Sequence, residues 1–210
     1  MNVLAVGAHF DDVELGCGGT LALHARRGEQ VTIYVATHSG YSAPDGREIR
    51  SRELARGEGE RGAEILGAEL LCGDWETNQL NYSDPLVCSV LEIVEERGID
   101  IIYTHWAEDA HQDHRALARA SITAGKHVPR ILMYQSNFYD GGEAFAGNFY
   151  VDIGVTLEQK KAAINAHESE LGRVGGDWLE VFLAKARVDG YRAGAAYAEA
   201  FEVVKYLGTP

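Results

Sequence analysis

Short apolar runs alternate along the chain with longer stretches in which apolar residues recur at helical spacing. The runs predict strands at residues 3–7, 30–37, 68–72, 99–105 and 130–135. The intervening stretches predict helices at 13–27, 48–66, 84–98 and 114–126, the first three of them closed by glycine. Strands that alternate with helices in this way indicate βαβ units. The pattern therefore predicts an α/β fold with a mostly parallel sheet and helices on both of its faces.

The pattern is less regular after residue 137. Residues 139–143 predict a flexible loop with an aromatic rim, 149–153 predict a further strand, and 156–171 and 177–188 predict two helices separated by a loop at 172–176. The sequence contains no internal repeat, low-complexity tract or linker. We therefore expect residues 1–210 to form a single domain with a small C-terminal elaboration.

Side chains with metal-binding and acid–base chemistry follow the ends of the predicted strands. His9, Asp11 and Asp12 come directly after the first strand, and His111 and His114 follow the fourth. Ligands of parallel α/β sheets bind outside the carboxyl ends of the strands, so we expect these side chains to share one site. Buried charges are disfavoured unless they share a cation, a mutual network or solvent. The cluster therefore suggests a metal site assembled from distant segments.

The amino-acid composition limits which binding partners and which cellular compartment we expect for this protein. The formal charge of −13 argues against a nucleic-acid partner and against an anionic membrane surface, because both select positive patches. Three cysteines without a Cys-x-x-Cys pair predict reduced thiols in a cytoplasmic protein. No run approaches the length of a membrane span, and no signal peptide precedes the first strand. A small neutral or amine-bearing substrate is compatible with this charge.

Two short motifs resemble those of a known family. Residues 8–14 read Ala-His-Phe-Asp-Asp-Val-Glu, and residues 111–114 read His-Gln-Asp-His. They resemble the Ala-His-Pro-Asp-Asp-x-Glu and His-x-Asp-His signatures of the PIG-L (LmbE-like) family of zinc-dependent de-N-acetylases. Further similarity covers 16–21, 63–68, 151–153, 161–169 and 198–201, in the family's order. The resemblance implies a Rossmann-like architecture, a deacetylase activity and self-association into homo-oligomers.

The resemblance also implies a role for each motif residue. His9, Asp12 and His114 match the family's metal ligands, for Zn²⁺ or alternatively Fe²⁺. Asp11 matches the general base that takes a proton from the attacking water. His111 matches the histidine that stabilises the oxyanion or protonates the leaving amine, and Asp113 would hydrogen-bond His111 and keep it cationic.

Some of these residues also have simpler interpretations. Asp11 and Asp12 could act only as a helix cap, Asp113 could do the same for the following helix, and His111 and His114 could be surface histidines. Phe10 stands where the signature has proline, which would have restricted His9 to extended conformations. Gln112 replaces another frequent proline.

Substrate-binding residues are expected outside the two motifs. We predict Arg56, Asp74 and Trp75 for this role, because the family carries an arginine and a glutamate, here Glu58, on the helix of residues 48–66, and because tryptophan suits sugar stacking. His38, His167 and Tyr139 are further candidates.

Three functions remain open from the sequence. The first is removal of the N-acetyl group from an N-acetylated amino sugar, such as a GlcNAc-type glycoside or specialised metabolite. The second is a metal-dependent amidase that acts on a non-sugar amide with the same residues. The third is a non-catalytic metal- or nucleotide-binding module, which is disfavoured because no Gly-x-Gly-x-x-Gly pattern follows the first strand.

Overall fold

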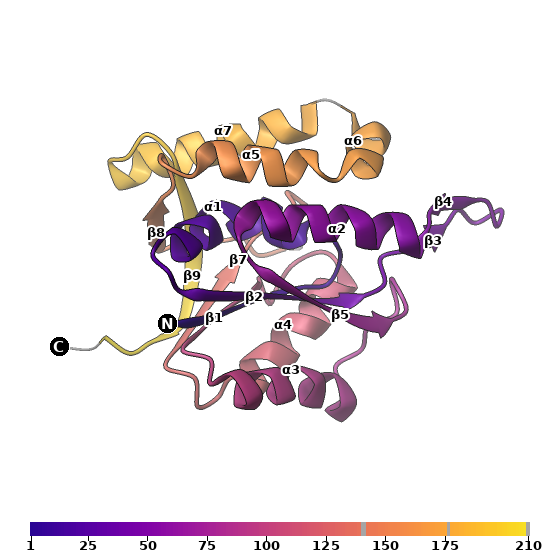
Figure 1. Cartoon of the computed structure of the whole chain (residues 1–210), viewed down its shortest axis with the longest axis horizontal. Helices are drawn as coiled ribbons and strands as arrows, with labels where there is room; N and C mark the ends of the chain where they lie inside the picture. Colours follow the sequence, from indigo (N-terminus) through magenta and orange to yellow (C-terminus); the bar gives the residue numbers. More distant parts are fainter. Residues whose placement is uncertain (140–141, 176, 209–210) are drawn as a thin grey trace.

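A seven-stranded β-sheet with the order β5-β2-β1-β6-β7-β9-β8 forms the centre of the computed structural model, which describes residues 1–139, 142–175 and 177–208 (Figure 1). Its strands are β1 Asn2–Gly7, β2 Gln30–Thr37, β5 Glu69–Trp75, β6 Ile101–His105, β7 Arg130–Tyr134, β8 Phe149–Asp152 and β9 Ala198–Tyr206. The first five are parallel, and β9 pairs antiparallel with both β7 and β8. The predicted α/β fold with a mostly parallel sheet is confirmed.

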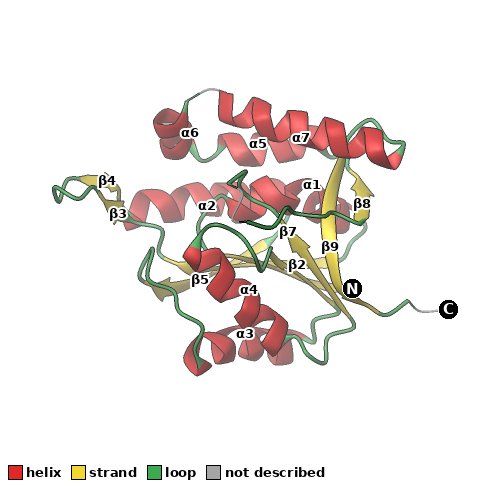
Figure 2. Cartoon of the chain, turned by 180° about the vertical axis from the view of Figure 1, so that it is seen from behind, coloured by secondary structure: helices red, strands yellow, loops and turns green. Residues whose placement is uncertain are grey.

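Helices cover both faces of the sheet, as Figures 1 and 2 show. One face carries α1 Asp12–Arg26 and α2 Arg52–Leu66, and the other carries α3 Asp84–Arg97 and α4 Gln112–Ala124. An outer layer against α1 and α2 is formed by α5 Leu157–Asn165, α6 Glu168–Val174 and α7 Asp177–Ala193. Within the described residues, no helix is both long enough and apolar enough to cross a membrane.

Strand β1 is buried on both faces, which explains its unbroken apolar sequence. Successive side chains of a strand point to opposite faces. Val3 and Ala5 accordingly pack into the apolar cluster beneath α1 and α2, while Leu4 and Val6 join the cluster over α3 and α4. The residues that follow β1 are therefore held at a fixed place at the edge of the core.

The segment before α2 differs from the prediction. The sequence predicts a helix from residue 48, but β3 Tyr41–Ser42 and β4 Glu48–Arg50 form a small antiparallel hairpin. Helix α2 begins after Ser51, because the Ser51 hydroxyl accepts a hydrogen bond from the Leu54 backbone N–H at 3.1 Å and caps the helix. Arg50 consequently ends the hairpin, where it is buried, instead of lying on the helix.

The C-terminal part also departs from the predicted pattern. The helix expected at 156–171 is divided at Ala166 and His167 into α5 and α6, and α6 continues into the loop predicted at 172–176. Strand β9 has no counterpart among the predicted strands, and its second half alternates between partly buried and exposed residues. The predicted loop at 139–143 includes Asp140 and Gly141, and that at 172–176 includes Gly176; these three lie outside the described residues.

Helix α2 approaches the loop after β1 closely through a glycine. A Cβ atom at Gly59 would lie 2.2 Å from Cδ1 of Phe10, whereas one at Gly57 would meet nothing nearer than Arg61 Nη1 at 3.7 Å. Gly59 therefore leaves room for the Phe10 ring, which precedes the aspartate pair.

This contrast gives a matched pair of substitutions on one helix. Gly59→Ala should lower the free energy of unfolding by about 1–3 kcal/mol, because the new methyl group overlaps the Phe10 ring. Gly57→Ala should raise it by about 0.5–1 kcal/mol, because alanine favours a helix more than glycine does. Chemical denaturation of both variants measures the difference, and equal effects of the same sign would contradict this packing.

Candidate metal centre and active site

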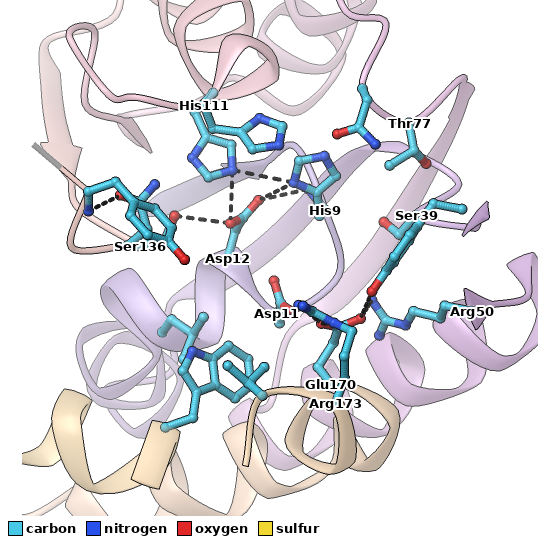
Figure 3. Close-up of a pocket in the computed structure, with 18 residues that line it drawn as sticks. His9, Asp11, Asp12, Ser39, Arg50, Thr77, His111, Ser136, Glu170 and Arg173 are labelled. Carbon is cyan, nitrogen blue, oxygen red and sulfur yellow. Dashed lines mark hydrogen bonds and ion pairs between the residues drawn. The ribbon is translucent and has the colours of Figure 1, made fainter. Parts of the chain in front are cut away.

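The candidate site lies where β1 and β6 end side by side. The chain adds strands outward from β1 on one side and from β6 on the other, so this is the topological switch point of the sheet. The loop after β1 and the first residue of α1 bring His9, Asp11 and Asp12, which Figure 3 shows facing His111. The start of α4 brings His111 and His114. All five line a cavity of about 330 Å³. The structure thus brings the two sequence motifs together.

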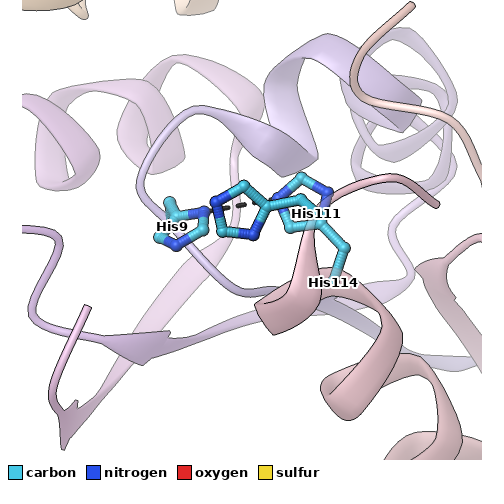
Figure 4. A group of neighbouring side chains, drawn as sticks. All are labelled: His9, His111 and His114. Atoms are coloured by element: carbon cyan, nitrogen blue, oxygen red, sulfur yellow. Dashed lines mark hydrogen bonds between the residues drawn. The ribbon is translucent and has the colours of Figure 1, made fainter. Parts of the chain in front are cut away.

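The three predicted metal ligands converge, with one nitrogen of each histidine close to a different oxygen of Asp12. Nδ1 of His9 lies 3.3 Å from Oδ2 of Asp12, and Nε2 of His114 lies 3.2 Å from Oδ1 of Asp12. The two imidazole nitrogens are 3.3 Å apart; Figure 4 shows the rings. Tetrahedral zinc with bonds of about 2.0–2.1 Å separates neighbouring donor atoms by about 3.3–3.4 Å. The donor types and their spacing therefore fit a zinc ion.

Each histidine of this triad is backed by a buried carboxylate on its other nitrogen. Nε2 of His9 lies 3.1 Å from Oδ2 of Asp113, and Nδ1 of His114 lies 3.2 Å from Oδ2 of Asp109. A carboxylate behind the distal nitrogen is the usual support of a metal-binding histidine, since it sets the tautomer and the ring orientation. His9 therefore presents Nδ1 to the centre, and His114 presents Nε2.

The two carboxylates are held in place in turn. Asp113 accepts the backbone N–H groups of Asn78 at 2.7 Å and of Leu80 at 3.0 Å. Asp109 accepts two hydrogen bonds from Nδ2 of Asn137, at 2.7 and 2.9 Å. Asp109 is not among the sequence candidates, although it lies in the loop that leads to the second motif.

The electrostatic field of the triad favours positive charge. Burial opposes protonation of His9, but hydrogen bonds to Asp113 and Asp12 outweigh it and raise its pKa to about 9. Burial likewise opposes protonation of His114, yet the charge of Asp12 and a hydrogen bond to Asp109 raise its pKa to about 10. A field that favours protons on the partly buried His9 and the buried His114 also suits a divalent cation.

His105 is a site residue that the motifs did not reveal. Its Nε2 accepts the Ala8 backbone N–H at 2.9 Å, and its Nδ1 lies 3.4 Å from the Ser136 hydroxyl, which donates to Oδ1 of Asp12 at 3.0 Å. Burial and the charge of His114 lower its pKa to about 4, so the ring is neutral. Although His105 groups with Asp12 and His114 as a possible donor set, its Nε2 is already bonded to the backbone. It therefore supports the Asp12 carboxylate.

Asp11 lies beside the triad in a strained conformation. Its φ of 131° is unusual for a residue other than glycine, and strained residues of this kind cluster at functional sites. Burial and the adjacent charge of Asp12 raise its pKa to about 7. As the N-cap residue of α1 it makes no side-chain capping hydrogen bond. The interpretation of Asp11 as only a helix cap is therefore not supported.

His111 is oriented differently from the prediction. Its Nδ1 accepts the Asp113 backbone N–H at 3.2 Å as the N-cap of α4, which in the neutral ring leaves the proton on Nε2. Burial and the charges of His114 and His9 lower its pKa to about 4. The expected bond from the Asp113 carboxylate to His111 is wrong, because that carboxylate reaches across to His9 instead. His114 is buried, so it is not a surface histidine.

The three residues predicted to bind substrate lie outside this cavity. Arg56 is exposed and pairs with Glu60 at 2.9 Å, and the Asp74 side chain is 87% exposed. Trp75 packs against the apolar cluster over α3 and α4. For Asp74 and Trp75 the physical reason is that β5 continues through Trp75, so the chain turns into the site only afterwards. Thr77 and Asn78 line the cavity in their place.

The opposite wall comes from the hairpin and the outer helices. Arg50 is 3% exposed and pairs with Glu58 at 2.7 Å, so the arginine that reaches the cavity comes from β4 and not from the predicted position Arg56. The other residues of this wall are Tyr41, Leu15, Glu170, Arg173, Val174 and Trp178.

The remaining candidates divide between the cavity and its surroundings. Tyr139 lines the cavity while remaining 74% exposed. His38 lies outside it, 3.1 Å from Glu76, and His167 is buried 3.3 Å from Glu14.

Comparisons with known proteins agree with this geometry. Residues 4–125 match the model of the PIG-L family, described as GlcNAc-PI de-N-acetylase. The uncharacterised deacetylase YaiS of Escherichia coli K12 is 34% identical over 64% of this chain and 73% of its own length. Diacetylchitobiose deacetylase of Thermococcus kodakarensis is 27% identical over 96% of this chain and 82% of its own. In fold, the chain resembles the conserved protein TT1542 of Thermus thermophilus, with a TM-score of 0.85, 24% identity and coverage of 100% and 97%.

The position of Asp113 behind His9 can be tested by substitution. The test separates support of His9 as a metal ligand from a role through His111. Asp113→Ala should weaken zinc binding by about 10- to 100-fold, because His9 loses the group that orients it. Competition with a chromophoric chelator measures this affinity, with exposed Asp74→Ala as the control. An unchanged zinc affinity together with lost activity would instead favour a role for Asp113 through His111.

Proposed function

Because the chain belongs to the PIG-L family of de-N-acetylases, we propose that it is a metal-dependent hydrolase that removes the N-acetyl group from an N-acetylated amino sugar. The observation that carries the proposal is the convergence of His9, Asp12 and His114 beside Asp11 in one cavity. The substrate class is supported by the Thermococcus kodakarensis relative, which is named for diacetylchitobiose.

Zn²⁺, or Fe²⁺ as the alternative, would be held by Nδ1 of His9, the Asp12 carboxylate and Nε2 of His114. The bound cation supplies Lewis-acid polarisation of the amide carbonyl and makes the hydrolytic water more acidic. The chain's own contribution is to fix both histidines through Asp113 and Asp109.

Asp11 acts as the general base in this proposal. Its carboxylate lines the cavity next to Asp12, where it can take the proton of the water that attacks the amide carbon. The carbon–nitrogen bond then breaks, and the proton passes from Asp11 to the departing amine. The products are acetate and the free amino sugar.

His111 acts as a hydrogen-bond donor to the oxyanion. Its Nδ1 is occupied by the Asp113 backbone N–H, so the neutral ring carries its proton on Nε2 and can donate it to a ligand in the cavity that His111 lines. A fixed donor aimed at charge that develops during the reaction stabilises the transition state more than the ground state. This role does not require the cationic ring that the sequence predicted.

The sugar would lie against the wall that faces the triad. Trp178, Leu15 and Val174 give this wall an apolar surface suited to the face of a sugar ring, and Asn78 and Asn137 supply amide groups at the cavity lining. The same apolar wall also suits an aromatic or alkyl amide. A metal-dependent amidase for non-sugar amides is therefore the second candidate.

Acetate release from a substrate panel tests the proposal. The panel contains N-acetylglucosamine, diacetylchitobiose, an aryl N-acetylglucosaminide and acetanilide, each with metal-free, zinc-loaded and iron-loaded protein. We expect metal-dependent release from the sugars and little from acetanilide. Release from acetanilide alone would favour the amidase, and bound metal without release from any amide would favour a non-catalytic module.

Two substitutions distinguish the proposed general base, Asp11, from a proposed metal ligand, His114. Asp11→Asn should leave zinc affinity within about threefold of wild type while lowering kcat by at least about 100-fold, because a base is lost and a ligand is not. Asparagine also tolerates positive φ. His114→Ala should abolish both metal binding and turnover. Wild-type kcat in Asp11→Asn would show that Asp11 is not the base.

A further inference from the structure

The backbone at Phe10 leads directly into Asp11, which has an unusual conformation. Asp11 has a φ of 131°, and Phe10 stands where the family signature has proline. Proline would have lacked a backbone N–H and restricted the preceding residue. Phe10 brings a backbone N–H into a position where the residue is only 2% exposed. That N–H needs a partner, because a buried unpaired donor is costly.

Two side chains from different elements bind the backbone on either side of Phe10. The Phe10 N–H donates to the Ser39 hydroxyl at 2.9 Å, and the Phe10 carbonyl accepts from Nη1 of Arg50 at 3.2 Å. The first bond holds the peptide between His9 and Phe10. The second holds the peptide between Phe10 and Asp11. Together they restrict the backbone that carries Asp11.

Ser39 is itself firmly placed. It is 1% exposed, and its backbone N–H donates to the Thr37 hydroxyl at 3.2 Å. That hydroxyl donates in turn to the Ala8 carbonyl at 2.7 Å. Ser39 has a φ of 55°, so two strained residues, Ser39 and Asp11, are linked through Phe10. The end of β2 thus supports the loop after β1.

Arg50 is anchored from the other side. Its Nη2 donates to Oε2 of Glu58 at 2.7 Å. Glu58 also accepts the backbone N–H and the hydroxyl of Ser169, at 2.8 and 2.7 Å. The guanidinium is 3% exposed and therefore reaches the Phe10 carbonyl from a fixed position. Ser39 and Arg50 both line the cavity, so the test must separate positioning from contact with substrate.

We propose that Ser39 and Arg50 are positioning residues for Asp11, and that their hydrogen bonds take over in this chain the conformational restriction that proline provides in the family signature. The catalytic consequence rests on the proposed function, in which Asp11 is the base. The structural consequence, a Phe10 amide protected by the Ser39 hydroxyl, does not depend on it.

The first variant is Ser39→Ala, with Ser121→Ala as its matched control. Ser121 is also buried, and its hydroxyl donates to a backbone carbonyl, that of Leu117 in α4 at 2.8 Å. Ser39→Ala should lower kcat by about 10- to 100-fold, because a small displacement of a catalytic group is enough for such a loss. KM and zinc affinity should stay within about threefold of wild type, and Ser121→Ala should retain wild-type kcat. Wild-type kcat in Ser39→Ala would overturn the proposal.

The second variant is Arg50→Lys, with exposed Arg56→Lys as its control. Lysine keeps the charge but cannot bind Glu58 and the Phe10 carbonyl together as a guanidinium does. A fall in kcat with unchanged KM supports positioning. A rise in KM with unchanged kcat would show that Arg50 binds substrate and would overturn its positioning role.

A measurement independent of activity completes the test. Amide hydrogen exchange, followed by NMR on the metal-free protein, should show a protected Phe10 N–H in the wild type and in Ser121→Ala. In Ser39→Ala its exchange should be at least about tenfold faster, because the hydrogen bond that protects it is gone. Unchanged protection would overturn the proposal whatever the activity. Lost protection in a protein without deacetylase activity would support the structural link while the proposed function fails.

Discussion

The whole site depends on the burial of Asp12 between His9 and His114. A carboxylate in this position is tolerable only with positive charge or hydrogen-bond donors around it, and both imidazole nitrogens lie within 3.3 Å of its oxygens. Asp113 and Asp109 behind the two rings add further negative charge. A cation at the centre would offset this negative charge, so the close spacing of His9, Asp12 and His114 is consistent with the proposed metal site.

The sequence predicted the centre of this arrangement well and its periphery poorly. The run at residues 3–7 is apolar because β1 is buried on both faces, so both the strand and the place where His9 follows it could be predicted. The edge strand β5 carries no such constraint, and its continuation through Trp75 keeps Asp74 and Trp75 away from the cavity. His105 and Asp109 depend on contacts across the sheet, which residue spacing along one segment does not report.

The misplaced role of Asp113 has a local cause. The His-x-Asp-His motif suggests that the Asp113 carboxylate contacts His111. In the structure, His111 caps α4 and accepts the Asp113 backbone N–H instead. The side chain is then free to reach His9, about a hundred residues earlier in the sequence. Asp113 therefore contacts two different histidines, His111 through its backbone N–H and His9 through its carboxylate. A motif identifies the groups, and only the helix geometry assigns their partners.

Phe10 departs from the family signature, and neighbouring residues compensate for the missing proline through hydrogen bonds and packing. Without proline, the backbone before Asp11 gains conformational freedom and an N–H donor. Both would disfavour the strained φ of 131° at Asp11. Ser39 uses the donor and Arg50 holds the following carbonyl, while Gly59 leaves room for the ring. Residues from β4, α2 and the loop after β2 thus meet around one peptide segment. Their common feature is contact with Phe10, so the backbone geometry of the proposed base depends on elements that contribute no ligand to the candidate metal centre.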